Sequence, residues 1–188
     1  EAVDLYRNLT AAQPDAFRPT LAASLSNLGN RLATVGRYAE ALAATEEAVD
    51  IRRNLAAAQP DAFRPDLAGS LSPLGAHLAA VGRYAEALAA TEEAVDLYRN
   101  LTAAQPDAFR PKLAISLNLL GDRLTALNRI EEALPAYEEA LHTLLPFYLA
   151  QPTAFAKAID DMVRNYVAAC QKQGCEPDAG LLAQVTGV

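Results

Sequence analysis

The chain repeats itself at a fixed interval. The block VGRYAEALAATEEAVD occupies residues 35–50 and again residues 81–96, so its two copies begin 46 residues apart. The shorter block EAVD begins at residues 1, 47 and 93, and EALH begins in the same phase at residue 139. A fixed interval of this length predicts a solenoid, in which each unit buries its apolar face against the next unit.

Each unit predicts two helices. In residues 65–81 leucines recur at steps of three and four, which is typical of a helix with one buried face. Pro65 is expected in the first turn of this helix, and Pro73 is expected to kink it. A second helix is expected over residues 84–104. The segment QPDAFRP should then end it, because a residue that precedes proline, such as Arg110, disfavours the α conformation.

These signals predict a solenoid over residues 1–175 that opens with a half unit. The first helices of the following units are expected near residues 19–35, 65–81, 111–127 and 153–173. Residues 176–188 are expected to form a C-terminal capping segment, since three apolar residues stand there at helical spacing: Leu181, Leu182 and Val185.

Residues 26–49, SNLGNRLATVGRYAEALAATEEAV, resemble a tetratricopeptide repeat. The matching positions are a Leu-Gly pair and a large apolar residue, a Gly and a Tyr at the turn, and two small residues where helices cross: Leu28, Gly29, Leu32, Gly36, Tyr38, Ala41 and Ala48. A later unit departs from the pattern, with Asn128 and Ile130 at the turn. The resemblance implies an all-α fold, a right-handed superhelical α-solenoid of antiparallel helix pairs. The repeat with its 46-residue period is similar to the long-helix arrays of kinesin light chains and of bacterial signalling proteins.

Charge and composition narrow the classes of function. The net charge is −7, and no basic stripe is present to neutralise phosphates, so a nucleic-acid partner is disfavoured. Apolar runs are short and interrupted by charge, so no membrane partner is expected. Two cysteines give no disulfide framework, and a cytoplasmic location is expected. Because the sequence begins inside a repeat, we expect it to be a piece of a longer protein.

Few residues have catalytic or metal-binding potential. Cys170 and Cys175 lack the further ligands that zinc needs, and Cys170 falls in phase with core leucines. His77 falls in phase with two arginines, so a solvated side chain is predicted. No nucleophile motif, phosphate-binding loop or HExxH helix occurs. The sequence therefore predicts a protein that is not an enzyme, with no catalytic, cofactor-binding or metal-binding residues.

The groove lined by the first helices is the expected partner-binding surface. In tetratricopeptide families this groove binds extended peptides or helices, and the resemblance transfers that role to the inner positions of the first helices. The expected partner-binding residues are Ser26, Asn27, Asn30, Ser72, Asn118, Asp122, Asp161, Arg164 and Asn165. The first three units carry no cation at these positions, so recognition of an acidic C-terminal tail is disfavoured.

The sequence thus favours a non-catalytic interaction module or scaffold that binds a peptide or protein. The resemblance implies a fragment of a larger bacterial signalling or sensor protein. Some proteins of that kind carry a STAND-type NTPase. The alternative is a structural or self-associating spacer without a peptide ligand. In the fourth copy, polar positions turn apolar, and self-association is expected there if the tail does not cover the patch Leu145, Phe147, Tyr148 and Leu149.

Overall fold

The computed structural model describes residues 2–186, and these residues form α-helices joined by short connections. They divide into two compact units: unit 1 ends at Leu97 and unit 2 begins at Tyr98, within α5 (Tyr84–Ala104). Consecutive helices pack against each other within each unit, so the predicted all-α solenoid is confirmed. No helix among the described residues is long and apolar enough to cross a membrane.

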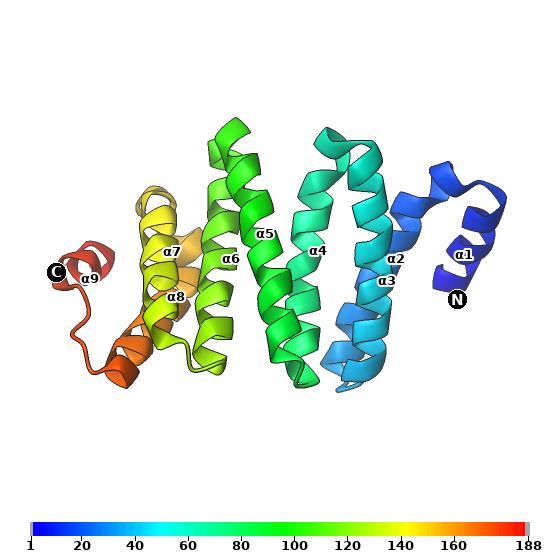
Figure 1. Cartoon of the computed structure of the whole chain (residues 1–188). Helices are drawn as coiled ribbons and strands as arrows, with labels where there is room; N and C mark the ends of the chain where they lie inside the picture. Colours follow the sequence, from blue (N-terminus) through cyan, green and yellow to red (C-terminus); the bar gives the residue numbers. More distant parts are fainter. Residues whose placement is uncertain (1, 187–188) are drawn as a thin grey trace. The chain divides into compact units, whose positions relative to one another are not determined.

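Unit 1 contains four complete helices and the first part of α5. They are α1 (Ala2–Ala12), α2 (Pro14–Thr34), α3 (Tyr38–Ala58) and α4 (Pro60–Ala80). Each contacts the next in sequence, and α2 also contacts α4. The first helices α2 and α4 therefore lie side by side, and the second helix α3 packs against both of them (Figure 1).

Unit 2 contains the rest of α5 and four further helices. They are α6 (Pro106–Ala126), α7 (Ile130–Ala150), α8 (Pro152–Gln173) and α9 (Ala179–Thr186). The first helices α6 and α8 contact each other, and both contact α7. The short α9 contacts α7 and buries Leu181 and Val185, which are 2% and 7% exposed.

A single glutamine separates each second helix from the next first helix. Gln59 has φ −138° and ψ 78°, and the three other copies have nearly the same conformation. The expected break at QPDAFRP is therefore wrong in its position, because the helix begins at the first proline of the segment: Pro14, Pro60, Pro106 or Pro152.

The second proline of this segment lies inside the helix, as Pro65 and Pro111 show, and Arg110 is helical. A proline at this place removes one backbone hydrogen bond and disfavours the α conformation of the residue before it. That cost falls near the start of a helix of 21 residues, whose packing outweighs it. The helix α4 likewise remains helical on both sides of Pro73.

The turn inside each helix pair needs a left-handed residue. Gly36 and Gly82 have φ of 78° and 82°, as expected for glycines that end a first helix. Asn128, the departure from the repeat pattern, adopts φ 59° at the same place. Asparagine is among the few non-glycine residues that adopt this region readily, so the turn is preserved.

The Leu-Gly position lets neighbouring helices approach closely. A Cβ on Gly75 would lie 2.9 Å from Thr91 Oγ1, and a Cβ on Gly121 would lie 2.5 Å from the Tyr137 ring. The predicted buried stripe of α4 is confirmed, because its four leucines are at most 6% exposed: Leu67, Leu71, Leu74 and Leu78. Val81, the next apolar residue along the stripe, is 36% exposed because it follows the end of the helix.

Candidate partner-binding grooves

Unit 2 contains a groove of about 510 Å³ between α6 and α8. Its lining includes five of the nine residues that the sequence singled out: Asn118, Asp122, Asp161, Arg164 and Asn165. Because α6 and α8 lie side by side, positions one repeat apart face the same space. The repeat and the packing of α6 against α8 together bring these polar side chains to one groove.

Four side chains in and behind this groove form a hydrogen-bonded cluster. The Tyr137 hydroxyl, from α7, donates to Asp122 Oδ1 at 2.8 Å. The Asn165 amide Nδ2 donates to the same oxygen at 3.0 Å and lies 3.4 Å from Asn118 Oδ1. Asp122 is thus held from two sides, by a tyrosine behind it and by an amide across the groove.

Burial changes the protonation of this cluster. Partial burial raises the pKa of Asp122 above its ordinary value, Asp161 adds to the effect, and the hydrogen bond from Tyr137 opposes it. Burial also raises the pKa of the Tyr137 hydroxyl, and the Asp122 charge beside it acts in the same direction. The raised pKa of Tyr137 keeps the proton on its hydroxyl, which is the donor in the hydrogen bond to Asp122.

The rest of the groove combines apolar and charged side chains. Ile115, 45% exposed, gives it apolar contact area, whereas Met162 also lines it but is 1% exposed. Arg164 pairs with Asp161 one turn away on α8 at 2.8 Å, and the exposed Lys157 also lines the groove. The Asn165 amide oxygen and the Asn118 amide nitrogen have no partner among the described residues. These two groups match the donor and acceptor of a peptide backbone.

In unit 1 the expected residues do not form one site. Asn27 lies in a separate groove with α1 residues, including Val3 and Arg7. Ser26 is half-buried and donates to its own helix at the Ala22 carbonyl, 3.0 Å away. Asn30 is exposed and Ser72 is half-buried.

Arg52 is a residue that sequence reasoning missed. It comes from α3, yet its Nη1 donates to Ser26 Oγ on α2 at 2.8 Å. Burial lowers its pKa, and Asp66 on α4 partly compensates. The repeat did contain a signal, because an arginine stands at a position that is tyrosine in two other units, Tyr6 and Tyr98. Tyr137 was also missed, although it too departs from its repeat position, where the other units have Thr45 and Thr91.

The prediction for His77 was wrong. Its side chain is 5% exposed, and its Nδ1 lies 3.0 Å from Thr45 Oγ1. Thr45 donates its hydroxyl hydrogen to the Ala41 carbonyl at 2.9 Å, so Nδ1–H of His77 must be the donor. Histidine is shorter than the arginine that the repeat phase suggested, and its ring fits within the helix packing. Burial lowers its pKa.

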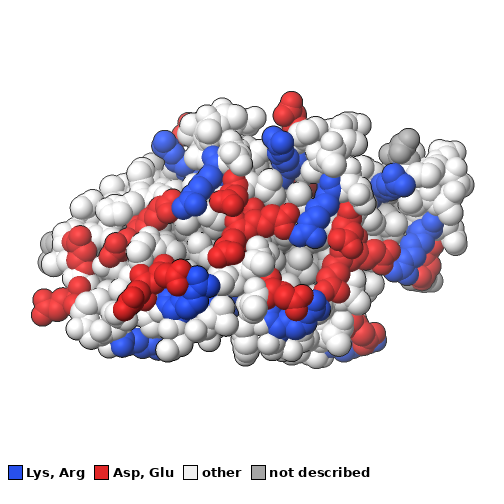
Figure 2. All heavy atoms as spheres, viewed as in Figure 1, with Lys and Arg blue, Asp and Glu red and all other residues white. Residues whose placement is uncertain are grey.

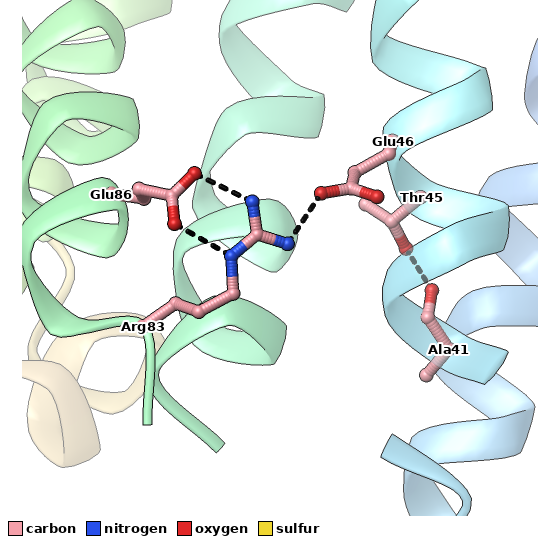
Figure 3. Close-up of polar contacts among 5 residues, drawn as sticks. All are labelled: Ala41, Thr45, Glu46, Arg83 and Glu86. Carbon is pink, nitrogen blue, oxygen red and sulfur yellow. Dashed lines mark hydrogen bonds and ion pairs between the residues drawn. The ribbon is translucent and has the colours of Figure 1, made fainter. Parts of the chain in front are cut away.

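A second groove, of about 410 Å³, lies in unit 1 between α3 and α5. Figure 3 shows Arg83 between its two acidic partners: Nη2 and Nε bind Glu86, and Nη1 reaches Glu46 on α3 at 3.0 Å. At the other end Arg53 pairs with Glu93 and Asp50. Figure 2 shows cations and carboxylates interspersed over α3. Because Arg53 and Arg83 are already paired, the ion pairs of this groove link the second helices to each other.

The apolar patch expected near the end of α7 is smaller than predicted. Leu145 is only 7% exposed and belongs to the core, since α7 is buried on the side that this residue faces. Phe147 stacks edge-on with Phe155 at a centroid distance of 6.2 Å. Tyr148 is half-buried, and Leu149, at 62%, is the exposed member. Cys170, expected in the core, is 1% exposed.

No group of three or more His, Cys, Asp or Glu side chains with metal-binding geometry occurs within residues 2–186. The charged side chains described above form pairs and braces at the surface. The features that stand out for recognition are therefore the α6–α8 groove and its polar cluster.

Comparisons with known proteins give one family and one fold. Residues 66–143 and 21–59 match two family models, each described as tetratricopeptide repeat, and together they cover more than half of the chain. A comparison with curated proteins found no match. Among solved structures, the crystal structure of BtubC (BKLC) from P. vanneervenii is similar, with a TM-score of 0.55 and 21% identity over 98% of this chain and 76% of that chain. This similarity concerns the fold alone, that is, the arrangement of the helices.

Proposed function

The chain belongs to the tetratricopeptide-repeat family, and from this premise we propose that the α6–α8 groove of unit 2 binds an extended peptide segment of a protein partner. The repeats themselves indicate a protein–protein interaction or scaffold module. The finer proposal rests on the polar cluster in the groove, because Asn118 and Asn165 contact each other from α6 and α8 and keep amide groups available.

The physical argument concerns the peptide backbone. Every residue of an extended peptide presents one N–H and one C=O, and an asparagine amide can satisfy both. Asp122 fixes the Asn165 amide by accepting its hydrogen at 3.0 Å, so less side-chain entropy is lost when a peptide binds. Ile115 supplies exposed apolar area for a side chain of the peptide. Because the proposal rests on backbone hydrogen bonds and apolar contact, the proposed role is binding without catalysis.

The test is a selection of linear peptides from a random display library against the full chain. Peptides that bind through the groove should lose binding to the double variant Asn118→Ala and Asn165→Ala. The matched control is Asn100→Ala, an exposed asparagine on α5 of the same unit, which should leave binding unchanged. Peptides that bind the double variant equally well, or a library that yields none, would contradict the proposal.

The same proposal includes the wider setting: a place in a larger bacterial signalling or sensor protein and in the cytoplasm. The alternative function, a self-associating spacer, has one supporting observation, the exposed Leu149 near the end of α7. Sedimentation of the full chain separates the two, since a spacer that self-associates should form dimers that Leu149→Ser abolishes. A peptide-binding module should remain monomeric in both forms.

A further inference from the structure

Both cysteines of the chain lie at the turn between α8 and α9. Cys170, near the end of α8, is 1% exposed, whereas Cys175 follows the helix and is exposed. Gly174, with φ 73°, folds the chain back over the helix end. The Cys175 backbone N–H then donates to the Cys170 carbonyl at 3.0 Å. The turn therefore places the two cysteine backbones next to each other.

The side chain of Cys175 also lies against Cys170. Cys175 Sγ lies 3.7 Å from the Cys170 carbonyl oxygen, and both thiols are free. Burial raises the pKa of Cys170, and its interaction with Cys175 acts in the same direction. A disulfide requires Cα atoms within about 7 Å. The covalent bonds and the 3.0 Å hydrogen bond that join these two Cα atoms cannot span more than that.

We propose that Cys170 and Cys175 are a modification site, which a peroxide converts into a reversible disulfide that fastens the turn leading to α9. The site is separate from the α6–α8 groove, and it does not depend on what the groove binds. Exposure decides the order of events. Peroxide reaches Cys175 first because its side chain is open to solvent, and the buried Cys170 acts as the resolving thiol.

The chemistry has two steps. In the first, the Cys175 sulfur attacks one oxygen of hydrogen peroxide, the O–O bond breaks, and the products are a sulfenic acid on Cys175 and one water. In the second, the Cys170 sulfur attacks the sulfenic sulfur, the S–S bond forms, and hydroxide leaves with the Cys170 proton as a second water. Two thiols lose two electrons, and peroxide gains them. A dithiol reductant reverses the reaction by exchange through a mixed disulfide.

The consequence of the bond is local. Hydrogen bonds hold the far end of the turn: the Asp178 backbone N–H donates to the Tyr166 hydroxyl at 3.1 Å, and the Leu181 N–H donates to Asp178 Oδ1 at 3.0 Å. Tyr166 in turn donates to Glu138 on α7 at 2.8 Å. A covalent link between residues 170 and 175 adds a fixed point at the near end. Because the closed ring is short, it should restrain the opening of α9 more than global unfolding.

The first measurement uses the full chain, treated with a stoichiometric amount of hydrogen peroxide. The intact mass should fall by the mass of two hydrogens, both titratable thiols should disappear, and dithiothreitol should restore them. Cys175→Ser should keep its remaining thiol, since Cys170 is buried. Cys170→Ala should instead gain one oxygen on Cys175. A wild-type chain that gains oxygen, that keeps both thiols, or that forms disulfide-linked dimers would overturn the proposal.

The second measurement is hydrogen exchange of the backbone amides in residues 176–186. These amides should exchange several-fold more slowly in the oxidised chain than in the reduced one, because α9 opens less often. Peroxide-treated Cys175→Ser is the control, and its exchange should equal that of the untreated variant. Equal exchange in oxidised and reduced wild-type chain would show that the bond does not fasten the turn.

Discussion

Units 1 and 2 solve the same packing problem with different side chains. In unit 1 the small Thr45 faces Gly29, and the ring of His77 fills the adjacent space and hydrogen-bonds to it. In unit 2 the large Tyr137 stands in the phase of Thr45 and faces Gly121, and Ala169 stands in the phase of His77. The large side chain of the pair is therefore on the first helix in unit 1 and on the second helix in unit 2. The exchange changes the polar contacts, because the Tyr137 hydroxyl reaches Asp122 in the groove, whereas Thr45 bonds to its own helix and to His77.

The units also end differently, and this gives the largest expected effect. Removal of residues 177–188 should destabilise unit 2 by roughly 3 kcal/mol, because the buried side chains of Leu181 and Val185 leave α7. The melting temperature should fall by roughly 10 °C in a thermal melt followed by circular dichroism. The uncovered apolar surface should also cause self-association in size-exclusion chromatography. An unchanged melting temperature with monomeric elution would contradict a capping role for the tail.

The glycine contacts allow a direct comparison of the units. Gly121→Ala should destabilise the chain by about 1–3 kcal/mol, because its Cβ would lie 2.5 Å from the Tyr137 ring. Gly75→Ala should cost less, since its closest neighbour is the Thr91 hydroxyl at 2.9 Å. Urea unfolding measures both. In a Tyr137→Ala background the cost of Gly121→Ala should nearly vanish, and a cost that stays the same would show that the ring is not the cause.

A smaller effect tests the histidine of unit 1. The pKa of His77 is lowered by burial, so below its ordinary value of 6.5 the unfolded state binds a proton that the folded state does not. The free energy of unfolding should therefore decrease as the pH falls from 6.5 toward the folded-state pKa. His77→Gln should flatten this dependence in urea unfolding series. The exposed His142 provides the control, and His142→Gln should leave the dependence intact.

The smallest expected effect concerns a feature that the two units share. Arg53 pairs with Glu93 in unit 1, and Arg99 pairs with Glu139 in unit 2, 40 residues further along the chain in each case. Both pairs are exposed, so Arg53→Ala and Arg99→Ala should each change the free energy of unfolding by no more than about 0.5 kcal/mol. High salt should reduce both changes. A markedly larger loss for either variant would mean that the units depend differently on their braces.

The sequence predicted the fold, and its repeat predicted which polar residues share a face. A helical repeat places residues one period apart on the same face, so Asn118 and Arg164, 46 residues apart, could be assigned to one groove without coordinates. The same logic failed for His77, because phase alone assigns a residue the environment of its counterparts even when its size differs. It also missed Arg52 and Tyr137, which reach the first-helix layer from second helices.

The period, the family pattern and the helical composition determine by themselves an all-α stack of helix pairs, since every unit must bury the same apolar stripe. The position of each helix end was decided by tertiary structure. Pro65 and Pro111 lie within helices because the packing of a long helix outweighs one lost hydrogen bond. The cluster around Asp122 was decided in the same way. A hydroxyl, a carboxylate and an amide from three helices meet only when close packing brings those helices together, and no local pattern in the chain encodes that meeting.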